Sequence, residues 1–461
     1  MRSPESLSRP GVPLRPLLGR ELRALAAGRA LWATALLLCP LVGYGFTEAV
    51  ALYAEASRSA EGVPELARGL TPLDGVLVPT LGAFYVAVTL FFPFVAIRAL
   101  GADKQDGGLK LLLQLPYPTA LLVLAKLAAA MAGWLLAVAP ALSALALWAA
   151  LGGHLHAPET LNLLLGHLLY GLLVAAVGLC AAAVAEGPAT AAIGALAFVL
   201  GALVLDFAAA GQGAWMRRLA DLSPTAALRG FEAGLFALPA VLGMLLGAAT
   251  LLALAVVWLP PGRTVARKLA LSAAVLAAAA ALAPAAARVR LYADLSESRR
   301  NSFAPGDEAA LRRIEGPLAI AVHLSPDDPR LADFERQVLG KLRRLVPRLS
   351  VTVAEPPRGL LTPTGDDRYG LVLYDYGGNH EESRSTSFRE VLPLIFGLAG
   401  VRPEPSAAAP DYPGYPLVAD AGPASAAWFY AVLPALLALA WWRVRRPAAP
   451  PAWLRPEGGS P

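Results

Sequence analysis

The chain has 461 residues, of which 56% are hydrophobic and only 16% are charged, and its net charge is +5. A soluble domain of ordinary composition carries about a quarter charged residues, so this deficit argues against a soluble protein. The charges concentrate in short blocks and in residues 288–425, which is typical of a polytopic α-helical membrane protein with one small α/β domain outside the bilayer. No basic stripe is interleaved with aromatic residues, so we expect no nucleic-acid partner.

An amphipathic segment lies ahead of the first long apolar run. In Pro13–Ala30, leucines recur at helical spacing while Arg15, Glu21, Arg23 and Arg29 fall elsewhere. This pattern predicts an interfacial helix that lies on the membrane before the first span.

Eight runs are apolar enough for bilayer spans, each of which needs about 20 such residues. The third run is long enough to tilt or to contain a break, and the seventh is rich in alanine and only moderately hydrophobic. The last run is short, and aromatic residues at both of its ends suit the two headgroup layers. The predicted spans are 31–53, 79–99, 121–151, 161–185, 188–210, 235–259, 268–287 and 426–442.

Basic residues predict the orientation, because short cytoplasmic loops collect Lys and Arg. With eight spans, both terminal tails and the loops after the second and sixth spans fall on one side, which we expect to be the cytoplasm at the inner (plasma) membrane. The acidic loop 54–78 and residues 289–425 then lie outside. Without the seventh span, the polar block would move to the cytoplasm, against the basic C-terminal tail. The basic residues are Arg2, Arg9, Arg15, Arg20, Arg23 and Arg29, then Lys104 and Lys110, then Arg263, Arg267 and Lys268, and finally Arg443, Arg445, Arg446 and Arg455.

The loop Gly101–Thr119 (GADKQDGGLKLLLQLPYPT) is the most informative feature on the predicted cytoplasmic side. Gly107 and Gly108 break the preceding helix, and the leucine-rich turn that follows stops at Pro116. Such a helix between two spans can dock a cytosolic partner, or it can be an ordinary short connection; the residues alone favour neither. Lys126 lies just inside the next span.

The polar block alternates strand and helix patterns, which predicts a small α/β domain. Gly377-Gly378 ends the third strand, and Asn379–Ser383 (NHEES) is expected to be a solvated turn because it lacks the second histidine of a zinc-protease motif. The predicted strands are Pro317–Ser325, Leu349–Ala354 and Tyr369–Tyr376, and the predicted helices are Pro329–Val346 and Phe388–Leu398.

The loop 101–119 resembles the segment of type 2 ABC transporter permeases in which an acidic stretch leads into Gly-Thr-Leu, a leucine-rich turn and a proline. Gly108 stands where that family has threonine, and Asp103 where it has glutamate. Six spans between residues 31 and 259 and the outer segment Leu222–Phe236 (LSPTAALRGFEAGLF) are also similar. The resemblance implies a permease subunit whose ATPase-coupling residues are Asp103, Asp106, Gly107, Leu109, Leu111, Leu112 and Pro116.

The start of the polar block resembles the extracytoplasmic domain of gliding-motility-type ABC auxiliary proteins. Asp294-Leu295-Ser296 follows a span, Ser302 comes next, and Tyr415–Asp420 (YPLVAD) precedes the last span, as in that family. There the permease and the auxiliary are usually separate chains, so this chain would fuse a permease to a shortened auxiliary domain. The resemblance implies an exporter or envelope-associated complex, with an auxiliary envelope protein as a further partner.

Several absences define the predicted role. The sequence has no G-x-x-x-x-G-K-S/T phosphate-binding loop, and Gly340-Lys341 lacks both the upstream glycine and the Ser/Thr. A separate cytosolic ABC ATPase is therefore implied. His154 and His156 share a short loop, but without cysteine and with Glu159 as the nearby acid an ordinary loop is favoured over a copper or zinc site. We predict no catalytic, cofactor-binding or metal-binding residues, no cofactor and no enzyme activity.

The leading hypothesis is a permease subunit in the lipid bilayer, working as a homo- or heterodimer with a second permease. One alternative is a scaffold whose outer domain recruits envelope partners. Another is a polytopic membrane enzyme with a catalytic outer domain, although no catalytic grouping is recognisable there. The predicted parts are the tail and interfacial helix (1–30), the six-span core (31–259), the loop and seventh span (260–288), the outer α/β domain (289–401), a Pro/Ala/Gly linker (402–425), the eighth span (426–442) and a basic tail (443–461).

Overall fold

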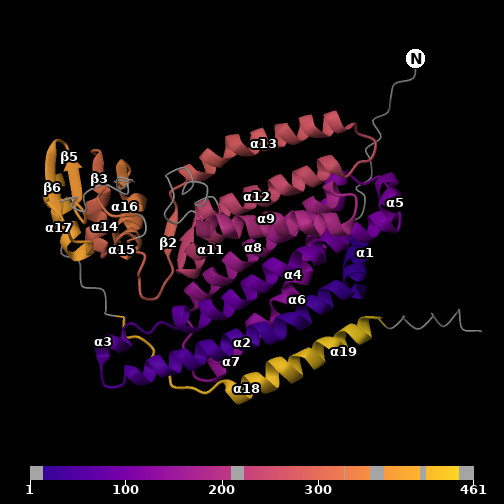
Figure 1. The fold of residues 1–461 in the computed structure, drawn as a ribbon, viewed down its shortest axis with the longest axis horizontal. Coiled ribbons are helices and arrows are strands. Elements are labelled where there is room, and N and C mark those ends of the chain that lie inside the picture. The colour runs from indigo at the N-terminus through magenta and orange to yellow at the C-terminus, as the bar shows by residue number, and fades with distance from the viewer. Residues whose placement is uncertain (1–13, 209–222, 326–327, 354–367, 405–411, 446–461) are drawn as a thin grey trace, which may run out of the picture.

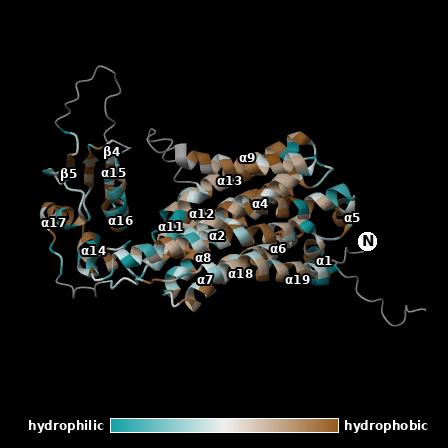
Figure 2. Ribbon diagram, turned by 60° about the horizontal axis from the view of Figure 1, so that its bottom comes forward, coloured by the Kyte–Doolittle hydropathy of each residue, from teal (hydrophilic) through white to brown (hydrophobic). Residues whose placement is uncertain are grey.

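Long helices lie side by side in one bundle, and a small unit that contains a β-sheet lies at one end of it (Figure 1). This computed structural model describes the chain except for residues 1–13, 209–222, 326–327, 354–367, 405–411 and 446–461. Apolar residues dominate the bundle, while polar residues gather at its two ends and on the small unit (Figure 2). Within the described residues, seven helical segments are long and apolar enough to cross a membrane: Arg29–Ser59, Leu73–Gln105, Thr119–Ala150, Ala157–Val184, Leu238–Trp258, Val265–Arg288 and Gly422–Arg445.

These segments correspond to seven of the eight predicted spans. The fifth prediction falls on the apolar helix α9 (Pro188–Ala208), and residues 209–210 lie outside the described part. The third span, for which the sequence left open a tilt or a broken end, is interrupted in its middle. It consists of α6 (Thr119–Ala137) and α7 (Ala139–Ala150), which meet at Val138 with a proline in the first turn of α7.

The remaining helices complete the bundle in chain order. The predicted interfacial helix is present as α1, and the loop after the first span contains a short helix and a π-helical turn. The bundle elements are α1 (Leu14–Ala27), α2 (Arg29–Ser59), α3 (Pro64–Ala67), η1 (Leu73–Leu77), α4 (Val78–Gln105), α5 (Gly108–Gln114), α8 (Ala157–Val184), α11 (Pro224–Glu232), α12 (Leu238–Trp258), α13 (Val265–Arg288), α18 (Gly422–Ala427), η3 (Trp428–Val432) and α19 (Leu433–Arg445).

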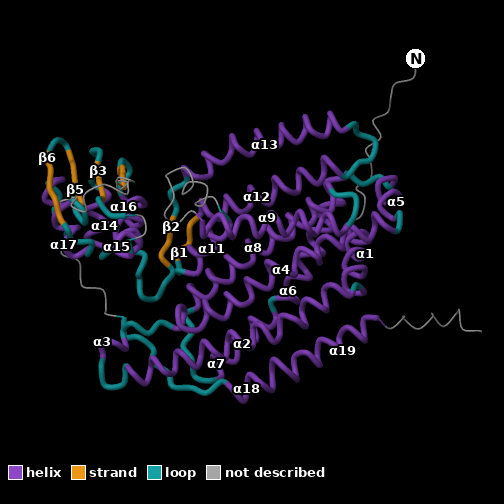
Figure 3. The backbone as a smooth tube through the Cα atoms, in the orientation of Figure 1, coloured by secondary structure: helices purple, strands orange, loops and turns teal. Residues whose placement is uncertain are grey.

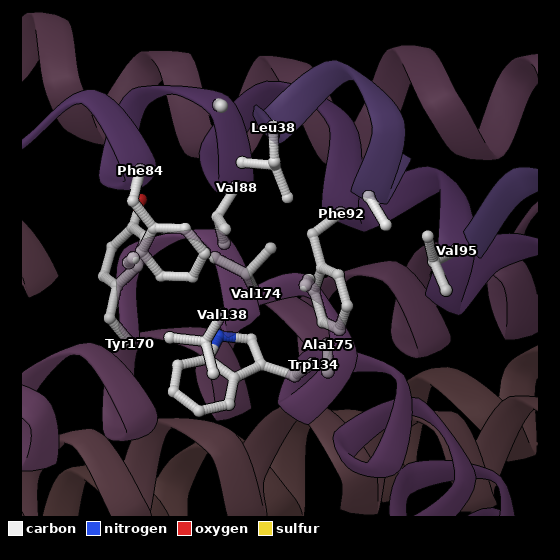
Figure 4. Close-up of a cluster of buried hydrophobic side chains, with 14 of the residues drawn as sticks. Leu38, Phe84, Val88, Phe92, Val95, Trp134, Val138, Tyr170, Val174 and Ala175 are labelled. Atoms are coloured by element: carbon white, nitrogen blue, oxygen red, sulfur yellow. The ribbon is translucent and has the colours of Figure 1, made fainter. Parts of the chain in front are cut away.

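Helix α8 lies at the centre of the bundle and packs against α4 and α12. Figure 4 shows the contact region, where Phe84 and Phe92 of α4 meet α8 and Trp134 of α6. Glycines bring the neighbours close: a Cβ at Gly171 would collide with Trp134, and one at Gly166 would lie 2.5 Å from Phe231. Small residues at helix contacts are typical inside a bilayer, where van der Waals packing drives helix association in place of the hydrophobic effect.

The small unit has a mixed four-stranded sheet in the order β4-β3-β5-β6, in which β3 and β4 are parallel and the other pairs antiparallel. Its helices and sheet share a separate apolar core that includes Ile320, Phe334 and Ile395. The predicted strands and helices fall where the patterns placed them. The elements are α14 (Pro305–Arg312), β3 (Leu318–Val322), α15 (Pro329–Phe334), η2 (Glu335–Leu339), α16 (Gly340–Leu345), β4 (Leu349–Val353), β5 (Val372–Tyr376), β6 (Asn379–Ser383) and α17 (Phe388–Ala399).

The prediction of a solvated turn at NHEES is wrong, because Asn379–Ser383 forms the edge strand β6. Gly377 and Gly378 have φ values of 60° and 89° and form the two-residue turn of a hairpin with β5. The strand is polar and mostly exposed, so the sequence lacks the apolar alternation from which strands are recognised. A polar edge of this kind protects a sheet against pairing with other chains.

A further strand pair joins the small unit to the bundle, and the sequence patterns do not predict it. Strand β1 (Leu235–Ala237), just before α12, pairs antiparallel with β2 (Tyr292–Asp294), just after α13 (Figure 3). Leu235 stands opposite Asp294 in the register. The segment that ends at Phe236 and the start of the polar block are therefore hydrogen-bonded to each other.

Candidate functional site

The predicted coupling loop folds as a short helix, α5, set between α4 and α6. Asp106 follows the last residue of α4, and Gly107 then takes a left-handed conformation with φ 74° and ψ −3°. That conformation is strained for residues with a side chain. Leu115 ends the helix in an extended conformation, as expected for a residue before Pro116. The glycine and proline of the motif therefore set the beginning and end of α5.

Helix α5 has an inner and an outer face, and the predicted site residues divide between them. Leu109 and Leu112 are buried, with exposed fractions of 8% and 6%. Leu111 and Leu115 are 67% and 46% exposed. The sequence pattern groups these leucines as one apolar helix and gives Leu111 and Leu112 the same role. In the structure Leu112 anchors the helix, and Leu111 is available to a partner.

The anchor of α5 is a small apolar cluster that is separate from the main core. Leu112 packs with Leu17 of α1 and with Leu122 and Ala125 of α6. The partly buried Tyr117 packs against this cluster. The interfacial helix, the coupling loop and the third span therefore share one set of packed side chains.

Beside this cluster lies a buried group of charges centred on Lys126, which is 2% exposed. Its Nζ donates to Glu21 Oε2 at 2.9 Å, to Asp103 Oδ2 at 2.5 Å and to the backbone carbonyl of Ala99 at 2.7 Å. An ammonium has three donors, so all of them are used. The cluster therefore joins α1, α4 and α6 through one side chain.

Arg20 completes the cluster from its solvent side. Its guanidinium donates to Asp103 Oδ1 at 2.6 Å and to Glu21 Oε1 at 2.5 Å. The hydrogen bond with Asp103 raises the pKa of Arg20. Two cations face two carboxylates, so the group is electrically balanced although most of it is withdrawn from water, as buried charges must be.

Helix α5 begins directly against these charges. A Cβ built on Gly108 would lie 3.4 Å from Asp103 Oδ1 and 3.8 Å from Arg20 Nη2. The position where the resembled family has threonine is thus in contact with the ion-pair cluster. A displacement of α5 would reach the charges that hold α1, α4 and α6 together.

The structure brings Asp103, Gly107, Leu109 and Leu112 into this corner, while Asp106 and Leu111 face outward. Glu21, which the sequence pattern leaves outside the leucine face of α1, is buried, with its side chain only 3% exposed. Arg20 and Glu21 are the functional residues that sequence reasoning missed. One signal was available: a lysine inside a span requires an acidic partner, although the pattern does not say which one.

Basic residues near this end of the bundle close the carbonyl ends of neighbouring helices. Lys104 donates to the carbonyls of Ala183 and Ala185 at the end of α8, at 2.9 Å each, and Lys268 donates to that of Trp258 at the end of α12. Cations at helix C-termini satisfy unpaired carbonyls and complement the helix dipole. The basic residues used to predict orientation therefore also have a local structural role.

Comparison with known proteins shows to which protein family the chain belongs. The chain belongs to the ABC-2 family of transporter proteins, whose family model matches residues 16–267, more than half of the chain. It is accordingly a multi-pass membrane protein and a membrane component of an ABC transporter. Members of this class are not enzymes themselves. In general they work with an ATPase partner and in a dimeric arrangement. Neither the curated proteins nor the solved structures gave a match.

Proposed function

We propose that this chain is a permease subunit that couples ATP hydrolysis in a separate cytosolic ATPase to the movement of a substrate across the inner membrane, as an exporter or envelope-associated complex. The full sequence has no phosphate-binding loop of its own. The proposal rests on one observation above all: the outer face of α5 is exposed and apolar at Leu111, while its inner face is fixed to Leu17 and to the cluster around Lys126.

The mechanism follows from those contacts. The ATPase binds the outer face of α5, and a push on α5 moves the start of this helix against Asp103 and Arg20. Since Lys126 holds α1 and α4 to α6, the three helices tilt together rather than separately. Rigid-body movement of packed helices about an interface is a common form of switching transition.

The proposed orientation places the α5 end in the cytoplasm. Arg20, Lys104, Lys110 and Lys268 lie on elements that meet there (Figure 1), and cytoplasmic loops are rich in Lys and Arg. Both termini are then cytoplasmic and residues 289–425 are extracytoplasmic. In this arrangement residues 31–259 form the six-span core, 289–401 form an auxiliary-like outer domain, and a second permease, identical or different, completes the path.

The docking role is tested by replacing Leu111 with aspartate and measuring co-purification with the cognate cytosolic ATPase, together with stimulation of its ATP hydrolysis. A charge on the exposed face should reduce both by at least about tenfold, since charged residues are depleted at interface cores. The matched control is Leu66→Asp, because Leu66 is 55% exposed on α3 at the other end of the bundle (Figure 1).

Equal ATPase binding by the two variants, in folded protein, would exclude docking through α5. Transport is tested separately, by ATP-dependent flux in a reconstituted complex. A complex that binds the ATPase through α5 but shows no flux would favour the scaffold role.

A further inference from the structure

Three potential ligand side chains meet at the end of the bundle opposite α5. His156 precedes α8, Glu159 lies in its first turn, and Glu297 follows β2. One ligand atom from each of the three residues lies within 4.8 Å of the other two. Glu297 is 138 positions from Glu159 in sequence, which is why the local pattern of histidines could not indicate this grouping.

The Glu297 side chain is held in place from both sides. The Tyr415 hydroxyl donates to its Oε1 at 2.5 Å, and His154 Nε2 lies 2.8 Å from its Oε2. The rings of His154 and Tyr415 stack at 3.6 Å with an angle of 13° between their planes. Partners of this kind around a carboxylate are typical of metal sites, where they orient the ligands.

Two carboxylates meet at this point, and the nearby cationic side chain of Arg300 is also engaged with other groups. The backbone N–H of Glu297 donates to Glu159 Oε2 at 3.0 Å, so the two carboxylates are held close together. Arg300, the charged residue nearby, forms an ion pair with Asp74 and donates to the backbone carbonyls of Glu232 and Ala233. Like charges in contact destabilise each other unless a cation or a proton separates them.

His156 supplies an unused ligand atom at the same place. Its Nδ1 is buried and has no hydrogen-bond partner among the described residues. A buried polar atom without a partner destabilises the folded state, so a group that engages this nitrogen would stabilise the protein.

We propose that His156, Glu159 and Glu297 bind a divalent cation of the zinc type. One imidazole nitrogen and two carboxylates are a ligand set used by zinc, with a fourth position open to water. Zinc–ligand bonds of about 2.0–2.1 Å place tetrahedral ligands roughly 3.4 Å apart, so the side chains need to close by no more than about 1.4 Å from the 4.8 Å limit. The Glu297 side chain is 21% exposed and has room for this movement.

The bound ion would connect two segments of the chain, the start of α8 and the connection that follows β2. His156 and Glu159 belong to the bundle, and Glu297 belongs to the connection between β2 and the small unit. Metal binding would therefore fix the small unit to the outer end of α8 and raise the stability of that junction, because an ion that binds only the folded state adds its binding free energy.

The test uses the full chain in detergent, stripped with EDTA and titrated with ZnCl₂ by calorimetry, with bound zinc counted by mass spectrometry. About one zinc ion per chain is expected, with an upward shift in Tm. His156→Ala and Glu297→Gln should each weaken zinc binding at least about tenfold. The matched control is His380→Ala, because His380 is 72% exposed and also faces a carboxylate, that of Asp375, at 3.0 Å.

Two results would overturn the proposal. One is zinc binding by the unmodified chain no stronger than that of His156→Ala. The other is a loss of binding in His380→Ala that matches the loss in His156→Ala. Glu297→Gln keeps the shape of the side chain, so a loss of zinc binding in this variant is not explained by misfolding. The size-exclusion profile of each variant is compared with that of the unmodified chain before titration.

Discussion

Lys126 of α6 and Glu21 of α1 form an ion pair at 2.9 Å between side chains that are only 2% and 3% exposed. Burying two charges costs several kcal/mol in lost hydration, and their attraction repays this only when every donor and acceptor is engaged. The three donors of Lys126 are engaged. The pair therefore fixes one arrangement of α1 against α6, and it does so next to the proposed docking helix.

Removing the lysine should destabilise the protein strongly. In Lys126→Met, Glu21 keeps a buried charge with Arg20 as its partner, and the expected loss is about 3–5 kcal/mol in the free energy of unfolding. Adding Glu21→Gln to Lys126→Met should recover part of this loss, since the remaining carboxylate of Asp103 still pairs with Arg20. Unfolding in mixed micelles, analysed as a double-mutant cycle, measures the coupling.

The control for this cycle is Arg343→Met, which removes an ion pair with Glu335 between exposed side chains. Such surface pairs contribute about 0–1 kcal/mol. The role of the buried pair would be contradicted if Lys126→Met and Glu21→Gln lowered the free energy of unfolding additively. It would also be contradicted if Lys126→Met and Arg343→Met lowered it equally.

Asp294 should be essential for the junction between the bundle and the small unit. Its carboxylate accepts hydrogen bonds from the backbone and hydroxyl of Ser296, from the backbone of Asn301 and from the hydroxyl of Ser302. Asp294→Ala removes all of them, and at about 0.5–1.5 kcal/mol each the expected cost is roughly 2–6 kcal/mol. Hydrogen exchange of residues 292–304 should accelerate correspondingly.

Asp333→Ala is the matched control, because Asp333 is 52% exposed and pairs only with Arg336 within its own helical turn. It should change exchange in residues 292–304 by less than twofold. Unchanged exchange in Asp294→Ala would show that β1 and β2 hold the junction without this carboxylate.

The stability of the small unit should rise with pH above about 8 because of Lys341. Burial lowers the pKa of Lys341 to about 8 from an ordinary value of 10.5, and its Nζ donates to the carbonyl of Ser302 at 3.0 Å. Between pH 8 and 10.5 the unfolded chain binds a proton that the folded chain does not, so the free energy of unfolding increases with pH. Below pH 8 both states are protonated, and the cost of burying the charge is fully present.

This dependence is measured by urea unfolding of the full chain at several pH values, followed through proteolytic susceptibility of residues 305–400. In Lys341→Met the rise between pH 8 and 10.5 should disappear. A rise of the same size in the variant would assign the effect to other groups that titrate in this range.

Spans and helices were predictable from the sequence because hydrophobic length and periodicity are local properties. The alternating pattern of β3 and β5 is equally local, and the structure has these strands where the pattern placed them. The polar strand β6 was missed for the same reason, since it carries no apolar alternation and exists only through its pairing with β5.

The sites were less predictable because their residues are far apart in sequence. Lys126 and Asp103 stood out as charged residues at the edge of spans, but Glu21 comes from another helix 105 positions away from Lys126. His156 was interpreted as part of an ordinary loop because Glu297 is absent from its neighbourhood in sequence. Leu111 is exposed and Leu112 is buried, and a leucine-rich pattern alone does not distinguish these two positions.

The pairing of β1 with β2 has a mechanical consequence for α12 and α13. Strand β1 leads directly into α12 and β2 follows α13, and the backbone N–H of Leu238 also donates to the carbonyl of Leu291 at 3.0 Å. The two helices are thus clamped at this end by backbone hydrogen bonds and joined at the other by the short turn 259–264. Because α12 and α13 are connected at both ends, we expect α13 to move together with α12 when α12 shifts against α8. The small unit follows β2 in the chain and should therefore move with this helix pair.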